Sequence, residues 1–219
     1  MSSTNNREQH REMATLDRVP LPVEAARIGM TGWQLTRTAL RVLPTLPGRG
    51  SLQDKVIKQI PATFADLGPT YVKFGQIIAS SPGAFGEQLS KEFRTLLDAV
   101  PPADTAEVHR LFKEELGADP AKLFAHFEEE PFASASIAQV HFATLHTGED
   151  VVVKIQRPGI RRRVAADLQI LKRFAQVVEL VKLGRRLSAK DVVADFADNL
   201  AEELDFRIEA QSMEAWVSG

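Results

Sequence analysis

A lysine within an apolar strand is the first feature of this sequence that calls for chemistry. Lys154 follows three valines and precedes Ile155. Burial of an ammonium group is costly unless a carboxylate or a bound anion pairs with it, so Lys154 predicts such a partner. The alternative is an edge-strand lysine that extends its ammonium group to water, and the strand taken alone favours that alternative.

A glutamate near the carboxyl end, Glu203, is the candidate partner. At 100° per residue it lies at the margin of the apolar stripe of its helix, within reach of a neighbouring strand. In kinase-like folds, a glutamate from the adjacent helix orients a strand lysine and thereby the nucleotide phosphates. The alternative is a solvated acidic face shared with Glu202, Asp205 and Glu209.

A segment of small residues precedes the expected strands, where a nucleotide-binding lobe would have its phosphate loop. It contains Ala133, Ser134, Ala135 and Ser136. Small side chains allow backbone N–H groups to approach phosphate oxygens, although a tight entry into a buried strand explains the same residues equally well. The sequence contains no GxGxxG or GxxxxGK[ST] pattern, which excludes the usual protein-kinase and P-loop motifs.

Lys73, Gly75 and Gln76 form the fourth candidate group. Lys73 and Gln76 share one face of a predicted helix, and the apolar residues lie on the other face. Glycine inside a helix costs about 1 kcal/mol relative to alanine, so we expect close approach of another backbone at Gly75. A solvated Lys/Gln face is the alternative, and the spacing alone favours it slightly.

Two kinds of secondary structure are expected to position these groups. Apolar residues at helical spacing predict helices over 23–42, 51–67, 70–80, 86–100 and 105–116. Residues 136–145 and 151–156 predict a β-hairpin with a turn at 146–150. A long helix is expected from Ile160, and the capping residue Ser188 predicts a last helix. This order of elements predicts an α+β fold.

The composition excludes several classes of function. A formal net charge of −2 provides no field to hold nucleic acid. The absence of cysteine excludes disulfides and thiolate metal sites, and the histidines lack the spacing of helical metal sites. The sequence contains no run of about 18 apolar residues, so it predicts no transmembrane helix. We expect a cytoplasmic protein; peripheral membrane contact through 33–46 is the alternative to core packing of that stretch.

Taken together, these segments resemble the AarF/UbiB family of atypical kinase-like proteins. The resemblance is carried by 68–76, 100–102, 131–141, 151–160 and 203–207. It implies that Lys73, Gly75 and Gln76 are the KxGQ signature, on a helical extension that folds over the nucleotide cleft. It also implies that 133–138 replaces the glycine-rich loop and that Lys154 positions phosphates. Glu203 and Asp205 would be the ExD element, with Glu203 as the partner of Lys154.

The resemblance also implies a fold, ligands and partners. We expect a disordered tail over 1–20, a helical extension over 21–125 and an incomplete kinase-like small lobe, a β-sheet with flanking helices, over 126–219. ATP and Mg²⁺ are the implied cofactors, and ubiquinone biosynthesis, quinone metabolism or lipid metabolism is the implied setting. The implied partners are a carboxyl-terminal half or a membrane-associated protein of a quinone or lipid pathway.

The sequence departs from the family at its carboxyl end. Members continue into a catalytic loop with an Asp and an Asn and into a DFG-like metal-binding Asp, whereas this sequence ends at Gly219. Asp195 and Asp205 each precede a phenylalanine, but both are expected inside the last helix, where neither can form a metal loop. We therefore expect a fragment without a complete catalytic site or metal site. The alternative is a non-catalytic binding or regulatory module.

Overall fold

The structure, a computed structural model, describes residues 21–42, 51–96, 101–180, 188–207 and 209–210. The predicted tail over 1–20 lies outside these residues. The chain forms two compact units, the first of Met1–Leu97 with Arg161–Gly219 and the second of Asp98–Ile160. Each unit contains parts of both predicted domains, 21–125 and 126–219, so that division stays a prediction. Helices and a small antiparallel sheet confirm the α+β class.

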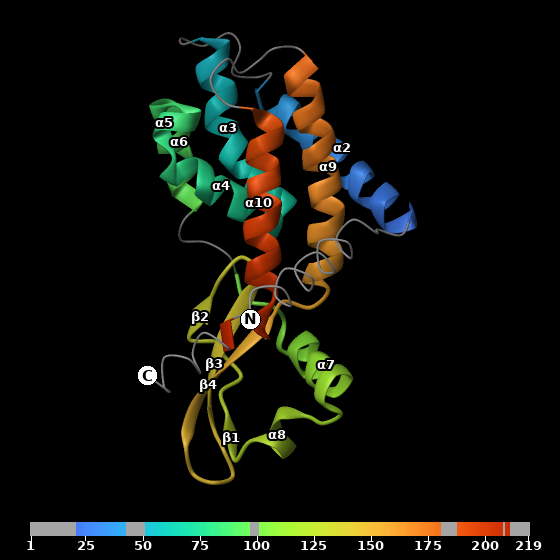
Figure 1. Cartoon of the computed structure of the whole chain (residues 1–219), viewed down its shortest axis with the longest axis vertical. Helices are drawn as coiled ribbons and strands as arrows, with labels where there is room; N and C mark the ends of the chain where they lie inside the picture. The colour runs from blue at the N-terminus through green and yellow to red at the C-terminus, as the bar shows by residue number, and fades with distance from the viewer. Residues whose placement is uncertain (1–20, 43–50, 97–100, 181–187, 208, 211–219) are drawn as a thin grey trace, which may run out of the picture. The chain divides into compact units, whose positions relative to one another are not determined.

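Helices build the first unit (Figure 1). They are α2 (Leu21–Val42), α3 (Leu52–Leu67), α4 (Pro69–Ser80), α5 (Pro82–Phe85), α6 (Glu87–Phe93), the 3₁₀ turn η2 (Arg94–Leu96), α9 (Ile160–Leu180) and α10 (Ala189–Leu204). Ser188 caps α10 as predicted, because its hydroxyl accepts a hydrogen bond from the Asp191 N–H at 3.3 Å. The helix predicted over 86–100 is shorter, and Gly86, at φ +89°, separates α5 from α6.

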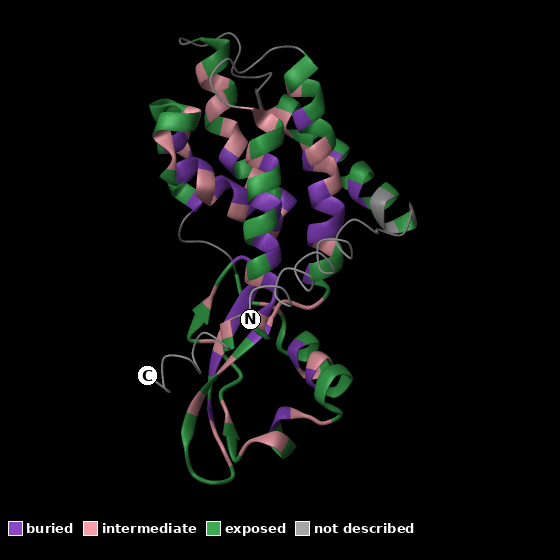
Figure 2. Cartoon of the chain, in the orientation of Figure 1, coloured by how far each residue is buried: buried purple, intermediate pink, exposed green. Residues whose placement is uncertain are grey.

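Aromatic side chains fill the core of this unit. The rings of Phe64 and Phe93 lie 4.9 Å apart, and those of Phe74 and Phe196 also lie 4.9 Å apart. Buried residues of α4, α9 and α10 are concentrated on inward-facing sides of these helices (Figure 2). Phe74 packs on Phe196, so α4 and α10 are held together by apolar contact.

A four-stranded antiparallel sheet and two helices build the second unit. Its elements are α7 (Thr105–Leu116), α8 (Pro120–Leu123), β1 (His126–Phe127), β2 (Ala133–Ser134), β3 (Ala138–Thr144) and β4 (Asp150–Gln156). The predicted hairpin is confirmed as β3 and β4. Because β4 pairs with the whole of β3, β1 and β2 both lie along the other edge of β3. Val108 and Phe112 of α7 pack with Ile155 of β4.

Candidate functional site: a lysine beside an alanine-rich segment

Sheet register places the alanine-rich segment in line with Lys154. Ala133 of β2 lies opposite Val140 of β3, and Val140 lies opposite Lys154 of β4. Directly opposite residues of antiparallel strands point to the same face, so Ala133, Val140 and Lys154 form one row. Two strand spacings separate its ends by about 10 Å. Two predicted nucleotide-binding elements therefore share one face of the sheet.

The face that carries this row is apolar and exposed. Val152 lies opposite Phe142, one step along the hairpin from Lys154, and these side chains are 60% and 45% exposed. The ring of Phe132 stacks on Phe142 at a centroid distance of 4.2 Å. Gln139 and His141 point to the other face and are buried. One face of the sheet thus serves the core, and the other offers an apolar surface next to an ammonium group.

Lys154 itself is exposed, so the burial cost expected from its apolar strand does not arise. β4 is an edge strand of the described sheet, as the alternative interpretation required. Exposure alone fits a surface lysine as well as a lysine at an open anion site. The role of Lys154 in anion binding therefore stays a prediction.

The alanine-rich segment makes a tight turn into β3. The Ala135 N–H donates to the Ala138 carbonyl at 2.8 Å. Ala133 and Ala135 are exposed, and Ser136 is buried. The Ser134 hydroxyl accepts a hydrogen bond from Arg157 at 2.8 Å. The segment therefore serves as a strand entry, the structural role considered for it, while its small side chains lie on the surface.

Lys73 and Glu203 form an ion pair within the first unit. The Lys73 Nζ lies 2.9 Å from Oε1 of Glu203 and 2.7 Å from Oε2, and the two side chains are 29% and 35% exposed. The contact joins the KxGQ helix α4 to α10, beside the packing of Phe74 on Phe196. The pairing of Glu203 with Lys154 would join the two units and stays a prediction.

Sequence reasoning did not pair Lys73 with Glu203, although a signal was available. Phe196 and Glu203 are seven residues apart, two helical turns, so they share one face of α10. Lys73 directly precedes Phe74, the ring that packs on Phe196. A helix that buries Phe74 against that face brings the ammonium group of Lys73 within reach of the carboxylate.

Gly75 is buried, and its close neighbours are side chains. A Cβ atom at this position would lie 2.7 Å from the Phe93 ring and 2.7 Å from Leu96. The expected close approach is confirmed. The expectation that another backbone makes it was wrong, because the nearest atoms belong to the Phe93 ring and a Leu96 methyl group. Gln76 is half-buried, and its carbonyl accepts a hydrogen bond from the Ser80 hydroxyl at 3.1 Å.

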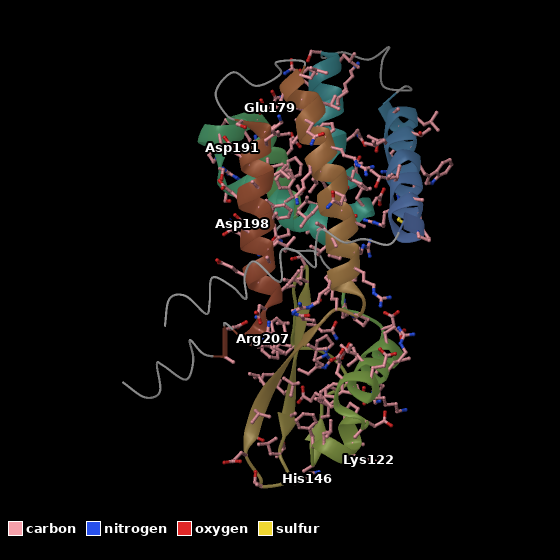
Figure 3. All side chains as sticks on the ribbon, turned by 45° about the vertical axis from the view of Figure 1, so that its right-hand side comes forward. Lys122, His146, Glu179, Asp191, Asp198 and Arg207 are labelled. Atoms are coloured by element: carbon pink, nitrogen blue, oxygen red, sulfur yellow. The ribbon has the colours of Figure 1, made fainter. Side chains whose placement is uncertain are left out.

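Asp205 caps the carboxyl end of α10. Its partner Arg207, labelled in Figure 3, follows two residues later. Oδ1 of Asp205 accepts from the Arg207 N–H at 3.0 Å and from Nε at 2.8 Å, and Oδ2 accepts from Nη2 at 2.9 Å. The hydrogen bonds from Arg207 lower the pKa of Asp205. Since α10 ends at Leu204, the expectation that Asp205 lies inside the helix was wrong; Asp195 does lie within it.

The sequence reasoning also missed a buried ion pair that fixes the start of the KxGQ helix. Arg27 of α2 donates to Oδ1 of Asp167 in α9 through Nε, at 2.8 Å, and through Nη2. Nη2 of Arg27 and Nη2 of Arg163 each donate to the Leu67 carbonyl at 3.1 Å. Leu67 ends α3, and α4 follows after Gly68. Burial raises the pKa of Asp167, and the charge of Arg27 opposes this effect.

Metal sites in proteins need several His, Asp or Glu side chains that converge on one point. Within the part of the chain that the structure describes, no group of three or more His, Asp or Glu side chains is arranged to hold a metal ion. Mg²⁺ stays a prediction, because that ion commonly binds through one or two carboxylates together with substrate phosphates. None of the described helices is long and apolar enough to cross a membrane.

A small antiparallel sheet with flanking helices agrees with the atypical kinase-like class expected from the sequence. Residues 95–218 match the family model of the ABC1 atypical kinase-like domain. The chain belongs to the AarF/UbiB family. This confirms the resemblance seen in the sequence.

Known relatives are longer than this chain. It is 81% identical over 209 residues to the uncharacterized protein Rv0647c of Mycobacterium tuberculosis, a match that covers 95% of this chain and 43% of the relative. It is 42% identical over 166 residues to the probable protein kinase UbiB of Azotobacter vinelandii, which covers 75% of this chain and 31% of that protein. The chain thus spans less than half the length of these relatives.

A solved structure is also similar. The complex of Rv3197 with erythromycin from Mycobacterium tuberculosis matches with a TM-score of 0.45 and 26% sequence identity. The match covers 85% of this chain and 43% of that chain.

Proposed function

We propose that this chain supplies ATP-binding elements of a UbiB-type atypical kinase or ATPase-like protein. The observation that carries the proposal is the row of Ala133, Val140 and Lys154 on an exposed apolar face. An ammonium group beside an apolar surface suits a ligand that combines a planar ring with a chain of phosphates.

Each part of this face has a defined role in the proposal. Val140 and Val152 offer apolar contact to the base, with Phe142 extending the surface. Lys154 donates charge-assisted hydrogen bonds to phosphate oxygens. Small side chains at Ala133 and Ala135 leave room for phosphate groups to approach the backbone.

The Lys73–Glu203 pair has a separate role in the first unit. It holds the KxGQ helix on α10 without burying either charge fully. ATP would enter with Mg²⁺ as its counter-ion, and no step is assigned to the metal, because no cluster of three or more His, Asp or Glu side chains among the described residues is arranged to hold it. Phosphoryl transfer by the whole protein, a role in quinone or lipid metabolism, and peripheral membrane contact belong to the same proposal and rest on the family relationship.

Isothermal titration with Mg-ATP tests the proposal. We expect Lys154→Ala to weaken binding by about tenfold or more, because it removes the charged donor from the row. Lys122→Ala is the matched control, since Lys122 is an exposed lysine of the same unit and lies outside the row. Absence of binding by the unsubstituted chain, or equal binding by the Lys154→Ala variant, contradicts the proposal and favours a non-catalytic binding module.

A further inference from the structure

Arg157 connects three separate segments of the second unit. It directly follows β4, three residues after Lys154. Its Nε donates to the Ala135 carbonyl at 3.0 Å, and its Nη2 donates to the Ser134 hydroxyl at 2.8 Å and to the Pro101 carbonyl at 2.6 Å. Its backbone N–H donates to the Ile137 carbonyl at 3.0 Å. One residue therefore holds three acceptors of the alanine-rich segment and one acceptor of the segment before α7.

The Pro101 end of this connection is anchored to the buried face of the sheet. The Ala103 N–H donates to Oε1 of Gln139 at 2.8 Å. Nε2 of Gln139 lies 2.8 Å from Nε2 of His141, and Nδ1 of His141 lies 2.7 Å from the Glu128 carbonyl. Gln139 and His141 are fully buried, so the acceptor at Pro101 is attached to a well-supported part of the fold.

The pairing of β2 with β3, the hydrogen bond from the Ala135 N–H to the Ala138 carbonyl and the burial of 136–138 also hold the alanine-rich segment, but its exposed start lacks such packing. Its exposed residues Ala133 and Ala135 have short side chains that bury little apolar area. No glycine in 133–138 sets the backbone through a positive φ. A guanidinium group, by contrast, is planar and has donors at fixed angles, so it fixes the spacing of the acceptors that it binds.

We propose that Arg157 is the positioning residue of the alanine-rich segment. It holds 133–138 against the 101–103 segment, and Ala133 stays in line with Lys154. As far as it concerns nucleotide, this inference rests on the proposed function. A preformed segment does not have to be ordered when phosphate binds, so loss of the guanidinium weakens binding without removing a phosphate contact.

The test combines hydrogen exchange with titration on the full 219-residue chain. The variants are Arg157→Ala, Arg157→Lys and, as a matched control, Arg162→Ala, an exposed arginine of α9. We expect Arg157→Ala to speed exchange of the 134–138 amides by about tenfold in the absence of nucleotide, because their conformation is no longer fixed. The amides of 140–144 keep their rates.

The same variants are then titrated with Mg-ATP. We expect Arg157→Ala to raise the Kd by about tenfold. The Kd of Arg157→Lys is expected to lie between those of the unsubstituted chain and Arg157→Ala, since an ammonium group cannot reproduce the planar arrangement of guanidinium donors. Arg162→Ala is expected to match the unsubstituted chain in both measurements.

Each departure from these results has a distinct meaning. Unchanged exchange at 134–138 in Arg157→Ala overturns the positioning role, whatever the titration gives. Faster exchange throughout 101–160 also overturns it, because Arg157 then supports the whole unit. Faster local exchange with an unchanged Kd overturns the link to nucleotide. If the unsubstituted chain binds no Mg-ATP, the proposed function fails, while the exchange result still decides whether Arg157 positions the segment.

Discussion

The two compact units differ in the polar groups that they bury. In the first unit, Arg27 and Asp167 form a buried ion pair, and Arg163 carries a second positive charge near the Asp167 carboxylate. In the second unit, a chain of hydrogen bonds links the Ala103 N–H, Gln139, His141 and the Glu128 carbonyl. The first arrangement depends on attraction between opposite charges, whereas the second consists of hydrogen bonds between neutral groups.

The backbone groups at the two ends of this series of hydrogen bonds determine which atom donates at each step. The Oε1 atom of Gln139 accepts from a backbone N–H, so its Nε2 must donate to His141. The Nδ1 atom of His141 faces a carbonyl oxygen and therefore donates. Each donor in this chain meets an acceptor, so it buries polar atoms without a net charge. The comparison predicts that removing a charge from the first unit costs more stability than breaking the chain in the second.

The largest effect is expected for Asp167→Asn. The substitution keeps the shape of the side chain but leaves the charge of Arg27 buried without a counter-charge. We expect a loss of about 3–5 kcal/mol in the free energy of unfolding, measured by urea denaturation. Arg27→Leu combined with Asp167→Leu is expected to lose less, because no unpaired charge remains. A loss for Asp167→Asn no larger than that of the double variant contradicts the comparison.

Breaking the series of hydrogen bonds in the second unit is expected to have the next largest effect. Gln139→Leu leaves the Ala103 N–H and Nε2 of His141 without their partner. We expect a loss of about 1–3 kcal/mol, since a neutral polar group costs less to strand than a charge. Urea denaturation followed by hydrogen exchange of the 101–144 amides measures it. If Gln139→Leu loses more free energy of unfolding than Asp167→Asn does, the expected order of the two units is contradicted.

Gly75→Ala tests whether apolar packing in the first unit is as demanding as its charges. The added Cβ meets the Phe93 ring and Leu96 at 2.7 Å, so neighbours must shift. We expect a net loss of about 1–2 kcal/mol in thermal or urea unfolding, because overpacking outweighs the better helix propensity of alanine. Gly83→Ala is the matched control, as no atom lies within 4 Å of its added Cβ. Equal stability of both variants shows that this core is loosely packed.

The smallest effect is expected at the surface of the second unit. Nε2 of His109 lies 2.8 Å from Glu129 and Nδ1 lies 3.3 Å from Asp119, which also pairs with Lys113. The hydrogen bond to Glu129, more than that to Asp119, raises the pKa of His109 above 6.5. The folded state therefore binds this proton more tightly, and the stabilisation is complete below pH 6.5 and lost as the pH rises through the higher folded pKa.

Thermal melting of the unsubstituted chain and of His109→Gln at several pH values measures this effect. We expect the unsubstituted chain to melt about 1–2 °C higher at acidic pH, because exposed ion pairs contribute little. The difference is expected to vanish at alkaline pH. A stability difference that instead grows with pH contradicts a raised pKa for His109 in the folded state.

Local signals in the sequence were sufficient for the longer helices and the β-hairpin, but not for the short elements α8, β1 and β2. The β-hairpin followed from two largely apolar segments and the turn between them, and Ser188 caps its helix as predicted. The alignment of Ala133 with Lys154 could not be predicted, because β2 has only two residues and shows no periodicity. Sequence alone thus located β3 and β4, but it gave neither the two short strands β1 and β2 nor the register that aligns β2 with the hairpin.

Long-range charge pairs were the main features that the sequence did not reveal. Asp167 follows three arginines of α9, a pattern typical of a solvated helix face, yet it is fully buried. Its partner Arg27 lies 140 positions away, and Lys73 lies 130 positions from Glu203. Helical periodicity reports which face is apolar, but it does not report which other helix brings a matching charge.

The junction between α3 and α4 limits which residues can change independently. Gly68, at φ +104°, would place a Cβ atom 2.2 Å from the guanidinium of Arg163. The same guanidinium and that of Arg27 share the Leu67 carbonyl. A side chain at position 68 would displace Arg163 and leave Arg27 as the remaining donor to that carbonyl. We therefore expect four positions to vary together among relatives: 27, 68, 163 and 167. A relative that replaces one of them should carry compensating replacements at the others.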